Sequence, residues 1–155
     1  MLLYTAGHSN RDFSAFAHLL RQNGIEAVAD VRSSPGSKRF PHFNRGNLQT
    51  RLPEMGISYS WFRDLGGMKR GRDEDGSVLD GLQGYRAYMR DPRFQKAVQE
   101  LLRLASSHRT AIMCAEKDPG KCHRLLLSRY LADRGHRVLH IVDEGELREQ
   151  GLETS

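Results

Sequence analysis

The chain has 155 residues, 38% of them hydrophobic and 28% charged, which predicts one folded domain rather than a disordered or fibrous protein. Its apolar runs are far shorter than the about 18 residues of a membrane span, and its first residues lack the pattern of a secretion signal. Two cysteines in such a chain favour reduced thiols, so we expect a cytoplasmic protein with no membrane partner. We expect a core over residues 1–143 and an acidic C-terminal tail over residues 144–155.

The formal net charge of +5 is not spread evenly along the chain. Residues 32–72 contain nine lysines and arginines but only two acidic residues, so the rest of the chain has a net negative charge. Arginine-rich segments suit phosphates and carboxylates, and the nearby Phe40 and Phe43 could stack on bases. A solvated surface or an arginine-rich genome would produce the same composition, and both alternatives stay open.

Hydrophobic periodicity, caps and glycines predict alternating strands and helices. The expected strands are residues 2–6, 25–31, 56–61, 110–114 and 137–142. The expected helices run from a Ser9 cap to Gly24, over residues 48–55, from an Asp91–Pro92 cap to about Ala105, and from an Asp118–Pro119 cap to Gly135. Residues 32–50 lack periodicity and are predicted to form a long ordered loop.

This alternation predicts an α/β fold, with an open and mostly parallel sheet of about four to five strands and helices on both faces. In such sheets ligands bind beyond the carboxyl ends of the strands. Four of the predicted strands end in titratable or glycine-rich segments, which places a candidate site at that edge.

The residue types at these strand ends suggest roles in catalysis and anion binding. His8 can exchange a proton near neutral pH, and Asp30 and Arg32 share one face of a strand. If Asp118 caps its helix, Cys122 lies in the first turn, where the amides lower the pKa of a thiol. The candidate catalytic residues are His8, Asp30, Glu116, Cys122 and His123. The candidate substrate-binding residues are Ser9, Arg11, Arg32, Gly66, Gly67 and Arg124.

Structural roles compete with several of these assignments. Ser9 could serve only as a helix cap, Glu116 as an ion-pair partner, and Gly66–Gly67 as a turn. Cys114 has the position of a small core residue. His8, His123 and the two cysteines could form a metal-ligand set, but the spacing of the cysteines is not that of a usual zinc site, so no metal is assigned.

Four motifs in order resemble the prokaryotic family catalogued as domain of unknown function 488. They are Thr5-Ala6-Gly7-His8-Ser9-Asn10-Arg11, Asp30-Val31-Arg32-Ser33-Ser34-Pro35 with Ser37 and Phe43-Asn44, Leu65-Gly66-Gly67, and Cys114-Ala115-Glu116 with Cys122-His123-Arg124. Ala6 departs from the larger aliphatic residue more often found there. The resemblance implies a compact α/β domain whose site is built from these motifs, and it implies no established reaction or cofactor.

Three functional hypotheses follow. The first is a small cytosolic enzyme acting on a phosphate-bearing or nucleic-acid-derived substrate. The second is a non-enzymatic nucleic-acid-binding module that uses residues 32–72. The third is a metal-dependent enzyme with histidine and cysteine ligands. The sequence predicts neither the cofactor nor the oligomeric state.

Overall fold

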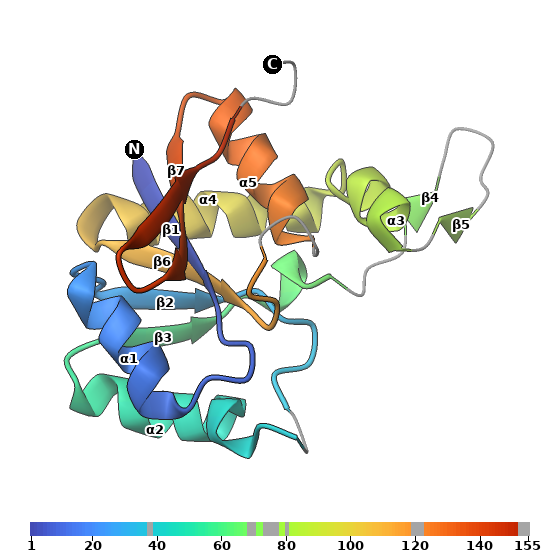
Figure 1. Cartoon of the computed structure of the whole chain (residues 1–155). Helices are drawn as coiled ribbons and strands as arrows, with labels where there is room; N and C mark the ends of the chain where they lie inside the picture. Colours follow the sequence, from blue (N-terminus) through green and yellow to red (C-terminus); the bar gives the residue numbers. More distant parts are fainter. Residues whose placement is uncertain (37–38, 68–70, 73–77, 80, 119–122, 152–155) are drawn as a thin grey trace.

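The computed structural model describes residues 1–36, 39–67, 71–72, 78–79, 81–118 and 123–151. Its centre is a six-stranded sheet with the strand order β3-β2-β6-β1-β7-β8 (Figure 1). The strands are β1 (Leu2–Gly7), β2 (Ala27–Asp30), β3 (Ser58–Trp61), β6 (Thr110–Cys114), β7 (Arg137–Asp143) and β8 (Glu146–Glu149). The first five are parallel to one another, and β8 is antiparallel to β7. The predicted α/β fold is therefore confirmed, with more strands than expected.

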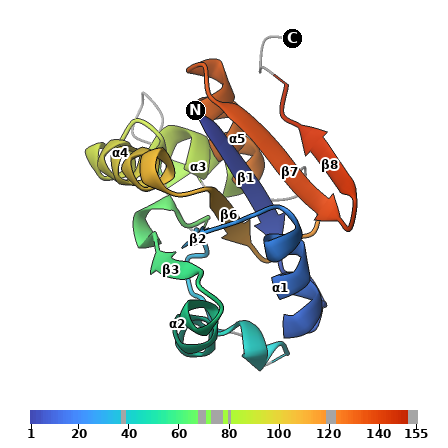
Figure 2. The same cartoon turned by 90° about the vertical axis from the view of Figure 1, so that its left-hand side faces the viewer.

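Helices cover both faces of this sheet (Figure 2). The α-helices among the described residues are α1 (Phe13–Gln22), α2 (Arg45–Glu54), α3 (Gly81–Tyr88), α4 (Pro92–Ser107) and α5 (Arg124–Asp133). Apolar side chains of α1 and α2 pack on the face that contains Tyr4, Val28 and Met113. Those of α3, α4 and α5 pack on the opposite face with Leu3 and Ile112. The alternation of strand side chains explains why neighbouring residues of one strand enter different cores.

The segment predicted as a long loop over residues 32–50 contains two helical elements. A 3-10 helix, η1 (Pro41–Phe43), precedes α2, which begins at Arg45 rather than near Leu48. Only Leu48 and Leu52 of α2 are buried, so the helix has too few apolar residues to produce a clear periodic signal. A second 3-10 helix, η2 (Arg63–Leu65), follows β3.

Other helix boundaries also differ from the prediction. Asp12, rather than Ser9, caps α1, and its side chain accepts a hydrogen bond from the Ala15 backbone amide at 2.7 Å. The predicted Asp91 cap of α4 is confirmed, with Pro92 at the first helical position. Helix α5 begins at Arg124 with His123 at its N-cap, so Asp118 is not its cap. The proposed first-turn position of Cys122 lies outside the described residues.

Besides α3, two other parts of the chain carry structure that the sequence did not predict. The glycine-rich stretch after η2 leads to the short antiparallel pair β4 (Gly71–Arg72) and β5 (Val78–Leu79), which lies beside α3 (Figure 1). The expected acidic tail contains β8, which extends the main sheet beyond β7. Among the described residues, no helix is both long and apolar enough to span a membrane.

Candidate functional site

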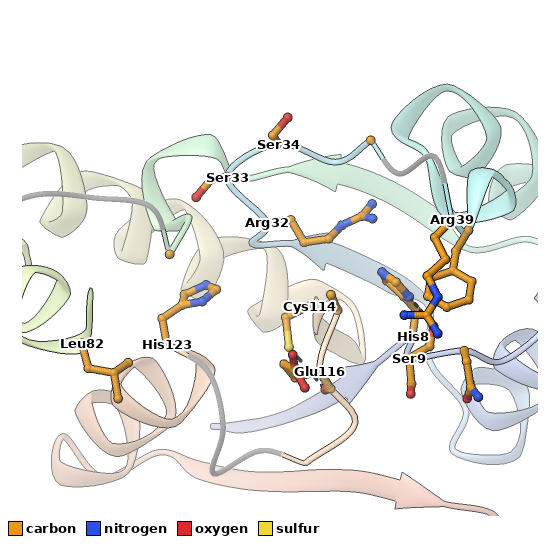
Figure 3. A pocket seen from close by; sticks show the side chains of 15 residues that line it. His8, Ser9, Arg32, Ser33, Ser34, Arg39, Leu82, Cys114, Glu116 and His123 are labelled. Atoms are coloured by element: carbon orange, nitrogen blue, oxygen red, sulfur yellow. Dashed lines mark hydrogen bonds between the residues drawn. The ribbon is translucent and has the colours of Figure 1, made fainter. Parts of the chain in front are cut away.

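A cavity of about 880 Å³ lies at the carboxyl edge of the parallel strands (Figure 3). The segments after β1, β2 and β6 line it, together with residues from η2–β4, α3 and the start of α5. Six of the residues proposed from the sequence lie in its wall: His8, Ser9, Arg32, Gly67, Glu116 and His123. The structure thus brings together residues from all four motifs.

Arg32 is held in this wall by a buried carboxylate. The Arg32 Nε and Nη2 atoms donate to the two carboxylate oxygens of Asp30 at 2.9 and 2.6 Å, and the Arg32 backbone amide adds a third bond. Asp30 is fully buried, and Tyr59 on β3 donates its hydroxyl to the same carboxylate. Burial alone would lower the pKa of Arg32, but the bonds and attraction to Asp30 outweigh it and raise that pKa. The charged guanidinium is therefore fixed before any ligand arrives.

His8 is a neutral imidazole with a defined tautomer. Its Nδ1 lies 2.8 Å from the Ser9 carbonyl oxygen, which can only accept, so Nδ1 carries the proton and Nε2 is the acceptor. The ring is 4% exposed and stacks on Phe43 with the ring centroids 4.5 Å apart. Burial, reinforced by the positive charge of Arg32, lowers the pKa of His8 to about 4. His8 therefore offers an unprotonated nitrogen at neutral pH.

The backbone around His8 has an unusual conformation. Ser9 has a φ of 50°, in the left-handed region that few residues other than glycine adopt. Its amide donates to the Ala115 carbonyl, and the His8 amide donates to the Cys114 carbonyl, so hydrogen bonds between these two segments continue beyond the end of β1. These contacts place Ser9 and His8 at the cavity.

His123 occupies another part of the cavity wall with the opposite tautomer. Its Nε2 donates to the Val31 carbonyl at 2.9 Å, so Nδ1 is the acceptor in the neutral ring. Burial is the main reason that the pKa of His123 is lowered. The ring packs 5.1 Å from that of Tyr85, measured between centroids. Gly67 approaches so closely that a Cβ there would lie 2.4 Å from the His123 Nδ1 atom.

Glycines also bring the other loops of the site into contact. A Cβ at Gly66 would lie 2.7 Å from the Cα atom of Ser33, and one at Gly7 would lie 1.7 Å from the backbone oxygen of Glu116. The Gly66–Gly67 pair, for which the sequence left a turn or a close backbone approach open, is therefore a place of close approach. These contacts hold the strand ends together around the cavity.

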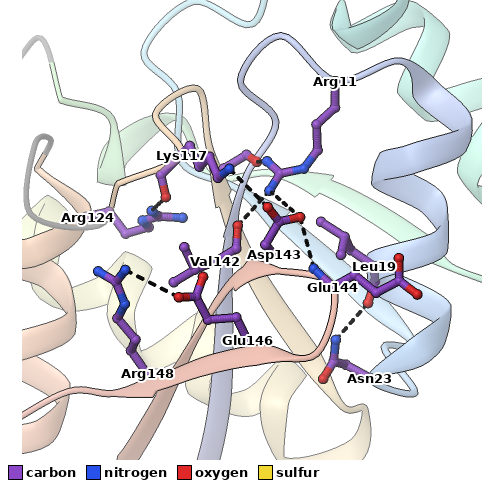
Figure 4. A network of polar contacts seen from close by, with 11 residues as sticks. Arg11, Leu19, Asn23, Lys117, Arg124, Val142, Asp143, Glu144, Glu146 and Arg148 are labelled. Atoms are coloured by element: carbon purple, nitrogen blue, oxygen red, sulfur yellow. Dashed lines mark hydrogen bonds and ion pairs between the residues drawn. The ribbon is translucent and has the colours of Figure 1, made fainter.

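Arg11 and Arg124, both proposed to bind substrate, do not line the cavity and instead donate to backbone carbonyls (Figure 4). Arg11 donates to the carbonyls of Gly7 and Val142 and so ties β1 to β7. Arg124 is only 1% exposed and donates to the carbonyls of Glu116 and Lys117 at 3.1 Å. In this structure both arginines support the loops that carry His8 and Glu116.

Lys117 belongs to the same network. Its ammonium group lies 3.1 Å from a carboxylate oxygen of Asp143, the last residue of β7. This ion pair ties the loop after β6 to the end of β7, and Arg124 ties the same loop to the start of α5 (Figure 4).

The cavity also contains residues that the sequence analysis did not assign. They include Arg39 and Leu82, and also Phe40, which the sequence indicated only as a ring for stacking on bases. The guanidinium of Arg39 lies 5.1 Å from the centre of the Phe40 ring. The basic segment indicated Arg39 only as one of many charges, and the sequence carried no sign of α3, which places Leu82.

Cys114, expected to be a core residue, is only 2% exposed and also lines the cavity. Its sulfur lies 3.6 Å from the Glu116 backbone oxygen. Within the part of the chain that the structure describes, no three histidine, cysteine or acidic residues could together hold a metal ion. The four-ligand set also requires Cys122, which lies outside the described residues.

Comparison with known proteins confirms the family resemblance. Residues 12–131, more than three quarters of the chain, match the family described as "Domain of unknown function DUF488". This range includes the second, third and fourth motifs and begins after the His8 segment. No curated protein and no solved structure matches the chain. The chain therefore belongs to the family of domain of unknown function 488.

Proposed function

We propose that this protein is a small cytosolic enzyme that binds a phosphate-bearing substrate in the cavity at the strand ends. The supporting observation is the pairing, in one wall, of a fixed guanidinium on Arg32 with a neutral imidazole on His8. Arg39 adds a second positive charge, and Glu116 is the one acidic residue among the described lining residues. This balance favours an anionic ligand.

His8 is assigned the role of proton acceptor. Its Nδ1 proton is committed to Ser9, so Nε2 is the atom that accepts a proton from the substrate or from a bound water. In the ligand-free protein, the pKa of about 4 would make it a weak base. A bound phosphate raises this pKa, because a negative charge nearby stabilises the imidazolium. Substrate binding thereby activates the base.

The alternative of a nucleic-acid-binding module rests on residues 32–72. Arg45 and Arg51 in this segment are exposed, with their guanidinium groups 4.6 and 3.8 Å from the ring centres of Trp61 and Phe13. Of the two rings that could stack on bases, however, Phe43 is fully buried and Phe40 is half-buried in the cavity wall. The geometry therefore supports the enzyme more strongly than an extended nucleic-acid surface.

The proposal is tested by titrating inorganic phosphate and pyrophosphate into the wild-type protein and two arginine variants in a calorimeter. Arg39→Gln removes a charge from the cavity, and we expect it to weaken binding about tenfold, or about 1.4 kcal/mol. Arg103→Gln removes an exposed charge from α4, away from the cavity, and serves as the matched control. Absence of binding to the wild-type protein, or equal losses in the two variants, would contradict the proposal.

Oligonucleotide binding distinguishes the alternative. A nucleic-acid module should bind single- or double-stranded oligonucleotides with an affinity that falls steeply with salt, because neutralised phosphates release counterions. The enzyme should bind phosphate compounds in the cavity without needing an extended strand. Tight, salt-sensitive binding of oligonucleotides that is weakened by Arg51→Gln, a change on α2 outside the cavity wall, would favour the module.

A further inference from the structure

The two ends of the cavity differ in chemistry (Figure 3). His8, Ser9 and Arg39 gather at one end, while Leu82 and His123 lie at the other, and Arg32 lies between them. We propose that the substrate is a nucleoside phosphate, with its phosphate at the Arg32–Arg39 end and its base between Leu82 and His123. This inference rests on the proposed function and narrows its substrate class.

Leu82 marks the apolar end. The described part of the chain has only three large exposed hydrophobic side chains: Met1, Leu82 and Leu147. Leu82 is 49% exposed and is the one of these three that lines the cavity. An exposed leucine in the wall of a cavity provides the apolar contact that ligand pockets use to hold rings. Without a ligand, its exposure to water has a free-energy cost that burial against a base would remove.

His123 provides a flat ring at the same end. The bond from its Nε2 to the Val31 carbonyl, the close approach of Gly67 and the packing against Tyr85 fix its orientation. Burial lowers the pKa of His123, which favours the neutral imidazole. A neutral ring does not repel the N–H and C–H groups at the edge of a base, which carry partial positive charge. A fixed neutral ring and a leucine together form a surface suited to a heteroaromatic base.

The middle of the cavity fits the remaining part of such a ligand. Ser33, which follows β2, also lies in the wall, and a serine hydroxyl matches the hydrogen-bonding capacity of a sugar. Sites for small molecules have volumes of roughly 300–1,000 Å³, and the cavity volume of about 880 Å³ lies in that range. A free phosphate would use only one end of this space.

The test compares four probes in the wild-type protein: inorganic phosphate, ribose 5-phosphate, and the nucleoside 5′-monophosphates of adenine and uracil. We expect at least one nucleotide to bind about tenfold more tightly than ribose 5-phosphate, because only nucleotides reach the Leu82–His123 end. Leu82→Ser should remove most of this advantage and leave the affinities for phosphate and ribose 5-phosphate unchanged. Leu147→Ser on β8, at 45% exposure, is the matched control and should change no affinity.

The outcomes separate this inference from the function on which it rests. If ribose 5-phosphate binds as tightly as both nucleotides, or if Leu82→Ser leaves the nucleotide advantage intact, the inference fails while the phosphate site stands. If none of the four probes binds to the wild-type protein, the proposed function fails as well. The wild-type comparison decides the substrate class without depending on the folding of any variant.

Discussion

Arg32 is held in position by two residues, Asp30 and Tyr59, that do not themselves line the cavity. Asp30 takes up its Nε and Nη2 protons, and Tyr59 helps to hold Asp30 in place. A bidentate arginine–carboxylate pair fixes both distance and plane, which a lysine could not do. The guanidinium therefore needs little rearrangement when an anion arrives, and this lowers the entropic cost of binding.

Tyr59→Phe tests this support. The substitution removes the hydroxyl that donates to the buried Asp30 carboxylate, and a bond to a charged group contributes about 1.5–3 kcal/mol. We expect the free energy of unfolding to fall by about that amount and phosphate affinity to fall several-fold, because Arg32 is held less firmly. Urea unfolding and calorimetric titration measure the two effects.

The matched control is Tyr130→Phe. Tyr130 on α5 donates to the neutral Gln95 side chain at 2.8 Å, outside the cavity. Tyr130→Phe should lower the free energy of unfolding by about 0.5–1.5 kcal/mol and leave phosphate affinity unchanged. If Tyr59→Phe also leaves the affinity unchanged, Asp30 positions Arg32 without help from Tyr59.

Gly67→Ala tests the close approach between the loop and His123. The new Cβ would lie 2.4 Å from the His123 Nδ1 atom, so the ring or the loop must move, at a cost of about 1–3 kcal/mol. Gly36→Ala is the control within the same cavity, since a Cβ there meets nothing within 4 Å. We expect Gly67→Ala to lower the melting temperature more than Gly36→Ala does, and thermal unfolding of both variants measures the difference. Equal melting temperatures would contradict the close approach of Gly67 to His123.

Residue identity predicted the location of the site better than the role of each side chain. Alternation along β2 correctly placed Asp30 and Arg32 together. It could not reveal that Arg11 and Arg124 bind carbonyl groups, because the sequence does not show which polar groups a loop leaves unpaired. Tyr59 lies on another strand, so its contact with Asp30 depends on the strand order.

Among the elements, those with strong local signals were predicted well. Strand β6 has the predicted bounds, and α4 begins at its predicted cap. Helix α3 was missed because it lies beyond a charged, glycine-rich stretch and spans only 8 residues, too few for a clear periodic pattern. Strand β8 was missed because all four of its residues are exposed, so no apolar alternation marks it.

Removal of residues 144–155 tests whether β8 is part of the folded sheet. The deletion removes β8 and its pairing with β7, the Arg137–Glu149 ion pair, and the hydrogen bond between the His140 and Gln150 side chains. Because His140 is buried, the loss of its partner should contribute most to a destabilisation of about 1–3 kcal/mol in urea unfolding. Phosphate affinity should be retained, since none of these residues lines the cavity. Unchanged stability would show that β8 contributes nothing to the fold.

For the whole molecule, the parallel sheet explains why distant motifs meet. The carboxyl ends of β1, β2 and β6 lie side by side because these strands are neighbours in the order β3-β2-β6-β1-β7-β8. The sequence predicted that the strands are parallel but not their order. The convergence of the motifs could therefore be predicted from the sequence. The different chemistry of the two cavity ends could not, because it depends on where α3 and α5 place Leu82 and His123.

The buried histidines should make the stability of the whole protein depend on pH. His8 has a pKa of about 4 in the folded protein against 6.5 when unperturbed, and His123 and His140 are shifted in the same direction, mainly by burial. As pH falls from 6.5 towards 4, the unfolded chain takes up protons that the folded chain does not, so stability decreases. His8 alone should account for about 2 kcal/mol between about pH 7.5 and pH 5.

His8→Asn should reduce this pH dependence while keeping a side-chain donor near the Ser9 carbonyl. Urea unfolding of the wild-type protein and the variant at the two pH values measures the difference. A wild-type protein that is equally stable at both values would show that burial does not hold these histidines neutral.

The most direct test of the proposed site is an NMR titration of the His8 imidazole, with and without saturating inorganic phosphate. We predict that the pKa of His8 is about 4 in the free protein and clearly higher when phosphate is bound. The bound anion stabilises the imidazolium and offsets the unfavourable effect of the Arg32 charge on it. A pKa near 6.5 that phosphate does not change would contradict both the neutral His8 and its place beside a bound anion.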